Sequence, residues 1–598
     1  MRLSYSRGLS ACGALVVSLL LCTSLSAQEA TTQWSLWLGS HYTGLEDYTL
    51  RVAEFDRGED GFAPEFRLDW KRLQGQNRLY LNGHYYDNKR MTLDLRGDYG
   101  GLLSGSVNYK SFNRRSQIDL LGNLIAREST NREGTAPGGK MLTNELLFDG
   151  TRTDVGYRRQ ELSADLELKM PFAKNLKVIA SHRAIFQDGD EQVASISHCS
   201  SCHIQSRLMD VEKRTNTTAV GLEADLDRVQ LSYTAQYRTF KSNVDPILAM
   251  YDPGAHPTIV DERAPGLAAE FSSRNSFSGE ELPIGLYPET EKLTHTIKAR
   301  ATVGKGTLLG QFVNLTSENV NSPDESSVAF DGDRKITGNY ANVKFAYPVM
   351  KTMKVVAGGH WGSFDNEALD IDVPTWRDGR AGGSLDVFDY TRYSVYSRTD
   401  MRGDLELIYQ PSNRYRLSVE AGYKTRDRED YFGDGLNDKT TTTSLGGKVK
   451  YRPSSQWTGR LAYTFENIDN PFAPNKLMFE RQGRTGVDSL GQENGAPQVY
   501  YYQRDALRYG DITSLPSMVN KGQLEVTYRP DAKWNVTAGI SGQIGTNSDE
   551  PELDYSRTTY QPRLALNVMP SDKFSVFSSY SYLYQTQNGI AAVAMMDG

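Results

Sequence analysis

The chain has 598 residues, a formal net charge of −7 and a mean hydropathy of −0.54, with 34 Tyr, 53 Gly and only 4 Cys. No run of about 18 apolar residues follows the first 27 positions, which excludes membrane-spanning helices. The charge becomes −9 without those positions, whose only charged side chains are Arg2 and Arg7, so no basic footprint for nucleic acid remains.

The first 27 residues are typical of a secretory signal. Two arginines precede an apolar stretch, Ala11–Leu21, that is too short for a spanning helix, and small and polar residues follow up to Ala27. We therefore expect cleavage after Ala27 and an exported mature chain of residues 28–598. The segment Leu9–Cys12 superficially resembles a lipoprotein cleavage box, but it lies before the apolar stretch, so we expect no lipid anchor.

Apolar and polar residues alternate in segments of about 10 to 14 residues from Trp34 to Thr586. In Arg414–Lys424, for example, Tyr, Leu, Val and Ala face one way while Arg, Ser, Glu and Lys face the other. The segment Glu161–Leu168 alternates in the same manner. The pattern suits strands between lipid and water, but it equally suits a large soluble β protein.

The lengths of the connections separate these two possibilities. Six Pro-x-x-Lys/Arg/Gln turns join strands tightly: Pro171–Lys174, Pro348–Lys351, Pro411–Arg414, Pro453–Gln456, Pro530–Lys533 and Pro570–Lys573. Long polar connections lie between them: Asn113–Val155, Asn243–Glu289, Asn366–Ser397 and Asn470–Pro516. Such asymmetry indicates an outer-membrane barrel, because loops this long are uncommon in compact soluble domains. We predict an all-β fold, a large transmembrane antiparallel β-barrel with short periplasmic turns and long extracellular loops, integral to the outer membrane of a Gram-negative-type bacterium.

The alternating segments predict about 21 strands, whereas a single-chain bacterial barrel closes with an even number. The chain also does not end on an aromatic residue, as such barrels commonly do. We expect either that Ile590–Met596 forms a closing strand or that the final C-terminal strands are missing, and we favour the second. A complete barrel would then have about 20–26 strands.

Two segments carry a resemblance to a known family. The meander Asn77–Lys110, with NRLYL, MTLDLR and SGSVNYK, and the segment LSVEAGYKTRDRED at Leu417–Asp430 resemble the MtrB/PioB outer-membrane barrels associated with multihaem cytochromes. Members of that family sheathe a periplasmic multihaem c-type cytochrome and carry electrons across the outer membrane, to or from extracellular iron or other acceptors. The resemblance implies this role here, with a cell-surface cytochrome as a further candidate partner. Two features depart from the family: its larger barrels extend beyond this chain's end, and the N-terminal Cys pair of some members is absent near Gln28–Ser40.

One motif carries recognisable chemistry. The only cysteines after the signal, Cys199 and Cys202, occur in the sequence HCSSCH and are followed by His203. Cys-x-x-Cys-His is the attachment signature of haem c, in which both thiols form thioethers and the histidine supplies an iron ligand. A plain disulfide in an oxidising compartment is the main alternative. A metal site or free thiols are weaker alternatives, and zinc is disfavoured because no second ligand pair has suitable spacing.

The order of turns predicts that Gly189–Arg214 is a long loop, either on the cell surface or folded down into the barrel mouth, where a haem could extend an electron path past the outer rim. The sixth iron ligand would then be His256, in the next long loop, or Met209. Acidic groups such as Asp188–Glu191 lack the spacing of a dedicated calcium loop. The remaining mature-chain histidines are expected on strands, lining the lumen or the membrane interface: His41, His84, His182, His295 and His360.

The function favoured by these patterns is not enzymatic, since no nucleophile–base arrangement or phosphate-binding glycine loop is evident. We expect a barrel that sheathes a multihaem cytochrome and forms a transmembrane electron conduit. The alternative is a general or substrate-specific diffusion porin, in which Cys199 and Cys202 would staple a constriction loop. An outer-membrane hydrolase is a third, weaker hypothesis.

Overall fold

The computed structural model describes eighteen stretches of the chain, and the expected signal and Ile590–Met596 lie outside them. The described residues are 29–44, 61–116, 127–128, 141–144, 155–198, 203–245, 247–250, 281–284, 287–320, 329–331, 334–367, 369–376, 385–392, 397–428, 439–471, 516–549, 554–571 and 573–589.

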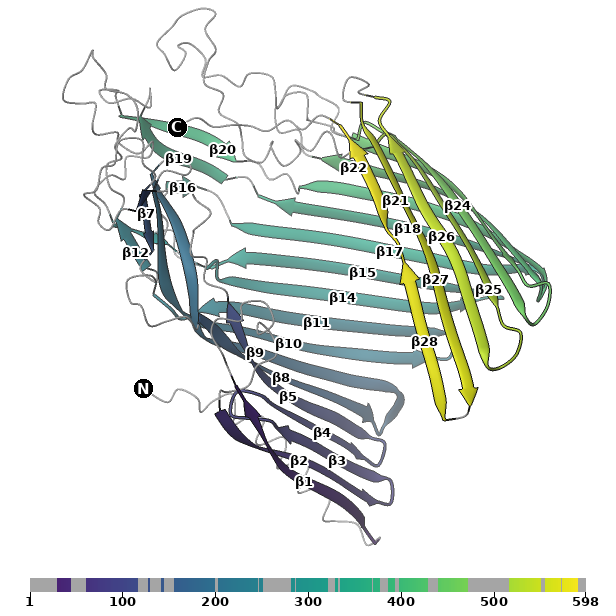
Figure 1. Ribbon diagram of the computed structural model, residues 1–598, viewed down its shortest axis with the longest axis horizontal. Coiled ribbons are helices and arrows are strands. Elements are labelled where there is room, and N and C mark those ends of the chain that lie inside the picture. Colours follow the sequence, from purple (N-terminus) through teal and green to yellow (C-terminus); the bar gives the residue numbers. More distant parts are fainter. Residues whose placement is uncertain are drawn as a thin grey trace, which may run out of the picture.

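A single, mainly antiparallel sheet dominates the fold, and its long strands pair in chain order (Figure 1). Its strands are β1 (Thr31–Thr43), β2 (Gly61–Gln74), β3 (Asn77–Tyr85), β4 (Met91–Tyr99), β5 (Leu103–Ser116), β8 (Val155–Met170), β9 (Ala173–His198), β10 (His203–Leu226), β11 (Val229–Ser242), β14 (Thr290–Val303), β15 (Gly306–Asn319), β17 (Lys335–Met350), β18 (Met353–Asn366), β21 (Arg398–Ser412), β22 (Tyr415–Arg428), β23 (Lys439–Tyr451), β24 (Trp457–Asp469), β25 (Met518–Tyr528), β26 (Trp534–Thr546), β27 (Ser556–Ser571), β28 (Phe574–Ser581) and β29 (Tyr584–Asn588). Because β28 and β29 pair with successive parts of β27, they are two halves of one interrupted strand. The described wall therefore has 21 successive strands, the number predicted.

Shorter strands lie within the long connections. Two of them join the main sheet through parallel pairing: β7 (Met141–Asn144) pairs with β10, and β6 (Arg127–Glu128) pairs with β7. The others form two small sheets, β12 (Ile247–Met250) with β13 (Glu281–Ile284), and β19 (Leu369–Trp376) between β16 (Ala329–Asp331) and β20 (Leu385–Arg392).

The main sheet curves into a deep trough but does not close (Figure 1). Among the described residues, β1 pairs only with β2, and β28 and β29 pair only with β27. No helix in the described part of the chain is long and apolar enough to cross a bilayer.

The predicted division between tight turns and long connections is confirmed. All six proline-containing segments lie at hairpin ends, and the four predicted long connections link β5 to β8, β11 to β14, β18 to β21 and β24 to β25. Three of the prolines, Pro348, Pro411 and Pro570, lie at the ends of strands, where the pairing register shifts. Proline lacks the N–H that an uninterrupted ladder would need, so a bulge accommodates it there.

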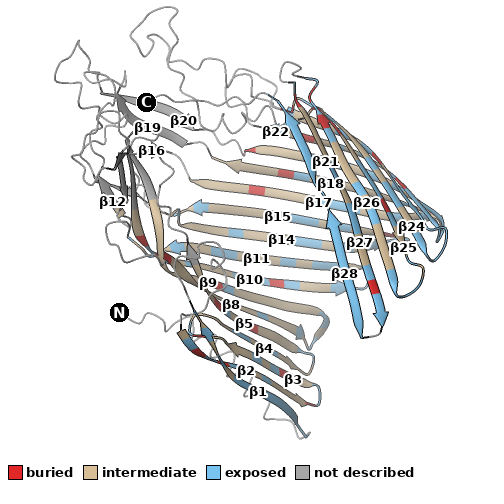
Figure 2. Cartoon of the chain, viewed as in Figure 1, coloured by how far each residue is buried: buried red, intermediate tan, exposed pale blue. Residues whose placement is uncertain are grey.

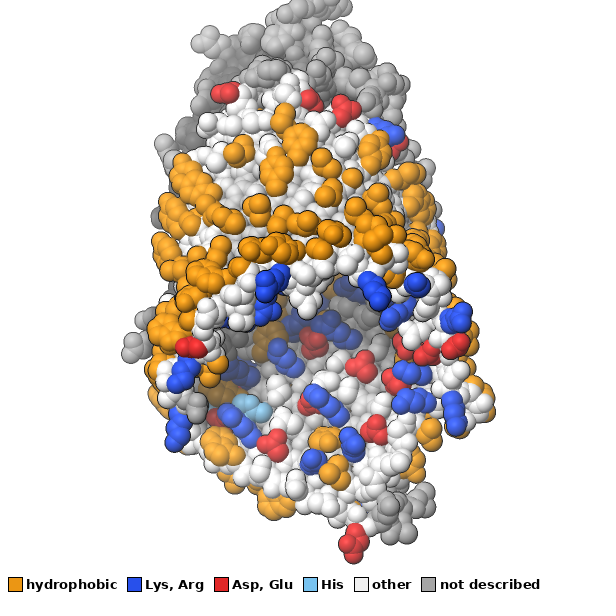
Figure 3. All heavy atoms as spheres, turned by 90° about the vertical axis from the view of Figure 1, so that its right-hand side faces the viewer, with side chains coloured by type: hydrophobic (Ala, Val, Ile, Leu, Met, Phe, Trp, Pro, Cys, Tyr) orange, Lys and Arg blue, Asp and Glu red, His pale blue; other side chains and the backbone are white. Residues whose placement is uncertain are grey.

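The outward face of the sheet is apolar, and only a small fraction of the described residues are buried (Figure 2). Along β14 the outward positions from Leu293 to Val303 span ten residues, or about 34 Å of strand. Tilted as barrel strands are, this stretch gives an apolar band about 25 Å tall, matching the lipid-facing band of outer-membrane barrels. Figure 3 shows this band of hydrophobic side chains around the outside of the trough.

Aromatic side chains gather on the outward face next to the short turns. Tyr415 stacks on Tyr451 with ring centroids 4.7 Å apart, and Trp457 lies 4.3 Å from Tyr528. Aromatic girdles mark the membrane–water interfaces of such barrels, because an amphipathic ring suits the boundary between lipid and water. The short-turn end therefore lies at a membrane–water interface, and short turns in such barrels are periplasmic.

One sequence prediction is wrong. Gly189–Arg214 is not a long loop: β9 and β10 continue through it as a hairpin, with Met209 opposite Glu191 and His203 opposite His198. Only four residues connect the two strands. Apolar alternation ends above the bilayer, where neither face meets lipid, while backbone pairing persists. This loss of alternation made the hairpin resemble a loop in sequence.

Candidate functional site

The inner face of the trough encloses a polar hollow of about 1630 Å³ (Figure 3). Twelve strands line it: β9–β11, β14, β15, β17, β18 and β21–β25. Ligand pockets of ordinary size are about 300–1,000 Å³, so this hollow is larger than a small-molecule site. We call it the lumen.

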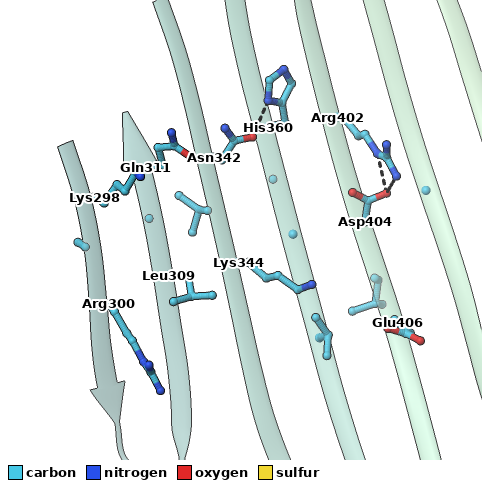
Figure 4. Close-up of a pocket in the computed structure, with 18 of the residues that line it drawn as sticks. Lys298, Arg300, Leu309, Gln311, Asn342, Lys344, His360, Arg402, Asp404 and Glu406 are labelled. Carbon is cyan, nitrogen blue, oxygen red and sulfur yellow. Dashed lines mark hydrogen bonds and ion pairs between the residues drawn. The ribbon is translucent and has the colours of Figure 1, made fainter. Parts of the chain in front are cut away.

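Register places charged and amide side chains in rows across the lumen wall. One row runs from Lys298 through Gln311 and Asn342 to His360 and Arg402, each on the next strand of the sheet (Figure 4). Because successive residues of a strand point to opposite faces, the same alternation that places leucine and tyrosine toward lipid places these groups inside. His360 Nδ1 lies 2.6 Å from Asn342 Oδ1 within this row.

Ion pairs connect neighbouring strands on the wall formed by β21–β25. Asp400 of β21 accepts from Arg426 Nε of the neighbouring β22 at 2.8 Å, and also from Arg398 Nε of its own strand at 2.9 Å. Further along, Lys448 Nζ lies 2.7 Å from Glu420 and Lys521 Nζ lies 2.8 Å from Glu466. Opposite charges on adjacent strands stabilise the pairing by about 0.2–1 kcal/mol each. The lumen face is thus charged with both signs, as the sequence predicted.

Glu525 of β25 joins three strands. Its side chain is only 9% exposed and accepts from Arg460 Nη1 of β24 at 2.9 Å and from Arg563 of β27. Arg563 reaches it across β26 because the intervening position is Gly539, where a Cβ would lie 3.2 Å from the guanidinium Nε. This bridging arrangement was not predictable from sequence, because it depends on a glycine at the same register position of the intervening strand.

Replacing Glu525 with glutamine is expected to lower the free energy of unfolding by about 1–3 kcal/mol, because two charge-assisted hydrogen bonds lose their acceptor charge. The matched control is Asp404→Asn, whose pair with Arg402 is exposed on both sides and contributes less than about 1 kcal/mol. Urea unfolding of the two variants refolded in detergent measures the difference. Equal losses of stability would show that the shielding of Glu525 from solvent does not strengthen its ion pairs.

The residues of the predicted haem site are mostly outside the described part of the chain. Cys199, Cys202 and His256 lie beyond it, and of His203 only the backbone is described, as the first residue of β10. The backbone does argue against Met209 as the sixth ligand: six extended residues place it about 20 Å along β10 from His203, too far to share one iron. Met209 is instead buried in the sheet.

The five remaining histidines lie on strands, as predicted. His360 faces the lumen, while the Nδ1 of His295 lies 2.9 Å from the hydroxyl of Tyr233 on the outward face. His182 Nδ1 lies 2.9 Å from Thr218 Oγ1. Near the extracellular end, His41 and His84 flank Glu65, at 3.7 and 2.8 Å. Among the described residues, no group of three or more His, Cys, Asp or Glu could hold a metal ion.

The apolar exterior, the aromatic girdle, the periplasmic turns and the charged lumen define an integral outer-membrane β-barrel. Residues 46–469 match the family model described as "Putative outer membrane beta-barrel porin, MtrB/PioB". The chain belongs to this family, which confirms the resemblance inferred from its sequence.

Solved structures similar to this chain include two receptor barrels. One is the closed form of the ferric-catecholate import receptor Fiu from E. coli K12, at 12% identity and a TM-score of 0.41, with 91% of this chain and 75% of that chain covered. Another is a mutant of the ferric enterobactin receptor PfeA from Pseudomonas aeruginosa, at 10% identity and a TM-score of 0.41, with 93% and 75% covered. No curated protein matches the chain.

Proposed function

We propose that this protein is the outer-membrane sheath of an electron conduit, enclosing a periplasmic multihaem c-type cytochrome for extracellular electron transfer, either metal reduction or iron oxidation. The observation that carries the proposal is a wide wall with a lumen face charged in both signs. Membership of a porin-like barrel family supports the assignment of the sheet as an outer-membrane barrel wall. The enclosed cytochrome is our inference.

Strand number sets the width of such a lumen. A closed wall of 21 strands, spaced about 4.8 Å apart and tilted about 40°, would have a backbone diameter of about 40 Å. Side chains reduce this to about 30 Å, which is the diameter of a small folded domain. Barrels of comparable strand number contain a plug within the lumen, whereas none of the described residues of this chain forms one.

The role proposed for the barrel is to exclude lipid and to position its partner. Its outward side chains contact lipid, so the enclosed protein needs no apolar exterior of its own. Its inner charges can exchange partners with polar side chains of the enclosed protein, since most lumen ion pairs are partly exposed. These functions require no catalytic group.

The Cys-x-x-Cys-His segment is proposed to hold one further haem. The donor set fits: Cys199 and Cys202 would supply the two thioethers, and His203 would supply a nitrogen ligand. When bound, such a haem would exchange single electrons at the tip of the β9–β10 hairpin. His256 stays a candidate for its second axial ligand.

Purification of the tagged barrel in mild detergent tests the sheath. We expect a haem-staining protein rich in Cys-x-x-Cys-His motifs to co-purify at about one copy per barrel and to resist protease while the barrel is intact. If no haem protein is retained and the barrel alone gives a large ionic conductance in planar bilayers, the protein is a diffusion porin instead.

A further inference from the structure

Three cations on one wall of the lumen have no counterion among the residues that the structure describes. Lys298 and Arg300 of β14 and Lys344 of β17 are exposed and line the hollow (Figure 4). None of them makes an ion pair with another residue in the described part of the chain, in contrast to the paired wall of β21–β25. We call these three residues the cation patch.

Register shows how isolated the cation patch is. Arg300 and Lys344 lie in one row with Leu309 between them, so their Cα atoms are about 10 Å apart. The next acidic residue of that row is Asp404, beyond Gly358, and it already accepts from Arg402 at 2.8 Å.

On the other side, Ser232 separates Lys298 from Glu223. The carboxylate of Glu223 lies 3.7 Å from Lys177 Nζ, so this acid also has a cation beside it. In the row of Arg300, Asp225 lies beyond Gln230 and accepts from Gln230 Nε2 at 3.3 Å. Among the described residues, none of these three acids forms an ion pair with the cation patch.

The lining of the lumen as a whole also carries more positive than negative charge. Ten lysines and arginines but seven aspartates and glutamates line the hollow, an excess of three positive charges. The whole chain carries a net charge of −7. A concave surface between low-dielectric walls focuses the field of such an excess, and anions are attracted to it.

The side chains of the cation patch do not converge. In Figure 4 the charged ends of Lys298, Arg300 and Lys344 point in different directions rather than toward one common point. A single phosphate or sulfate would need donors gathered around it, as in bidentate or multidentate anion sites. Several carboxylates spread over a protein surface fit the divergent arrangement better.

We propose that the cation patch docks an acidic face of the protein enclosed in the lumen and thereby fixes its rotation within the barrel. The identity of that occupant rests on the proposed function, while the preference for spread carboxylates rests on the geometry above. Complementary charges of this kind determine register and the rate of association more than total affinity.

A fluorescein-labelled decaglutamate peptide tests the cation patch without the partner. Fluorescence anisotropy with the full chain in detergent at 50 mM NaCl should show binding that weakens as salt increases. We expect the variant Lys298→Gln/Arg300→Gln/Lys344→Gln to bind at least tenfold more weakly. The variant Lys298→Arg/Lys344→Arg, which keeps the charges, should bind as the unsubstituted chain does.

The matched control removes three exposed lysines from periplasmic turns, Lys305→Gln/Lys351→Gln/Lys573→Gln, with the same change in net charge. It should alter binding less than twofold. The proposal is overturned if this control loses as much as the patch variant, if the patch variant binds normally, or if inorganic phosphate at equal charge concentration displaces the peptide completely.

The two proposals fail separately. Peptide binding by the cation patch without any co-purifying haem protein would reject the sheath and leave an anion-binding lumen. A haem protein that stays bound to the patch variant in 50 mM NaCl as firmly as to the unsubstituted barrel would reject the docking role alone.

Discussion

Replacing Leu524 with arginine is expected to destabilise the inserted barrel by about 2–4 kcal/mol, because the substitution places a charge near the middle of the lipid-facing band. That energy corresponds to roughly a 30- to 700-fold change in the folding equilibrium. Leu524 is 47% exposed and lies in an outward row with Leu461 and Ile540. Urea titration of the barrel refolded into lipid vesicles, followed by heat-modifiable migration on gels, measures the loss.

The control for this prediction is the adjacent substitution Gln523→Arg. Gln523 is exposed on the opposite face of the same strand, so its replacement adds an identical charge to the lumen side. We expect a change of less than about 0.5 kcal/mol there, as for ordinary surface substitutions. If both substitutions destabilise the barrel equally, the assignment of lipid and lumen faces is incorrect.

This contrast between neighbours is also the reason that the fold was predictable. A strand between lipid and water must alternate at every residue, so β22 and β8 were visible in sequence as Arg414–Lys424 and Glu161–Leu168. The division between tight turns and long connections then predicted which end of the barrel is periplasmic and which is extracellular. Each of these signals is local, and none requires knowledge of which strands pair.

Features that depend on pairing were not predictable. The contact of Arg563 with Glu525 needs Gly539 opposite both. The separation of Arg300 and Lys344 from Asp404 needs neutral residues, Leu309 and Gly358, on two strands of the same row. These arrangements depend on the register between segments that are distant in sequence. Amino-acid composition does not reveal that register. The lumen was therefore predictable as charged and polar, but not its division into a paired wall and a cation patch.

The extended hairpin was mistaken for a loop for a related reason. Above the bilayer the inward and outward faces are both hydrated, so selection for alternation ends while main-chain hydrogen bonds continue to hold β9 to β10. The pairing with β8 ends at Gly189, and β9 continues nine residues further, to His198. The hairpin tip thus lies about 30 Å along the strand beyond that point.

The mature protein is expected to carry covalent haem at this tip, detected as haem stain that survives denaturing electrophoresis, because thioether bonds to Cys199 and Cys202 resist unfolding. The variant Cys199→Ser/Cys202→Ser should lose the stain completely and keep the stability of the barrel, since the hairpin tip is remote from the lipid-facing band.

Thiol counting separates the alternatives, because Cys199 and Cys202 are the only cysteines after the first 27 residues. In the denatured chain, a haem leaves neither cysteine open to alkylation even after reduction. A disulfide opens both only after reduction, and a zinc site or free thiols open both beforehand. Alkylation of both cysteines, whether before reduction or only after it, would reject the covalent haem. Electron transfer would then depend on the haems of the enclosed partner alone.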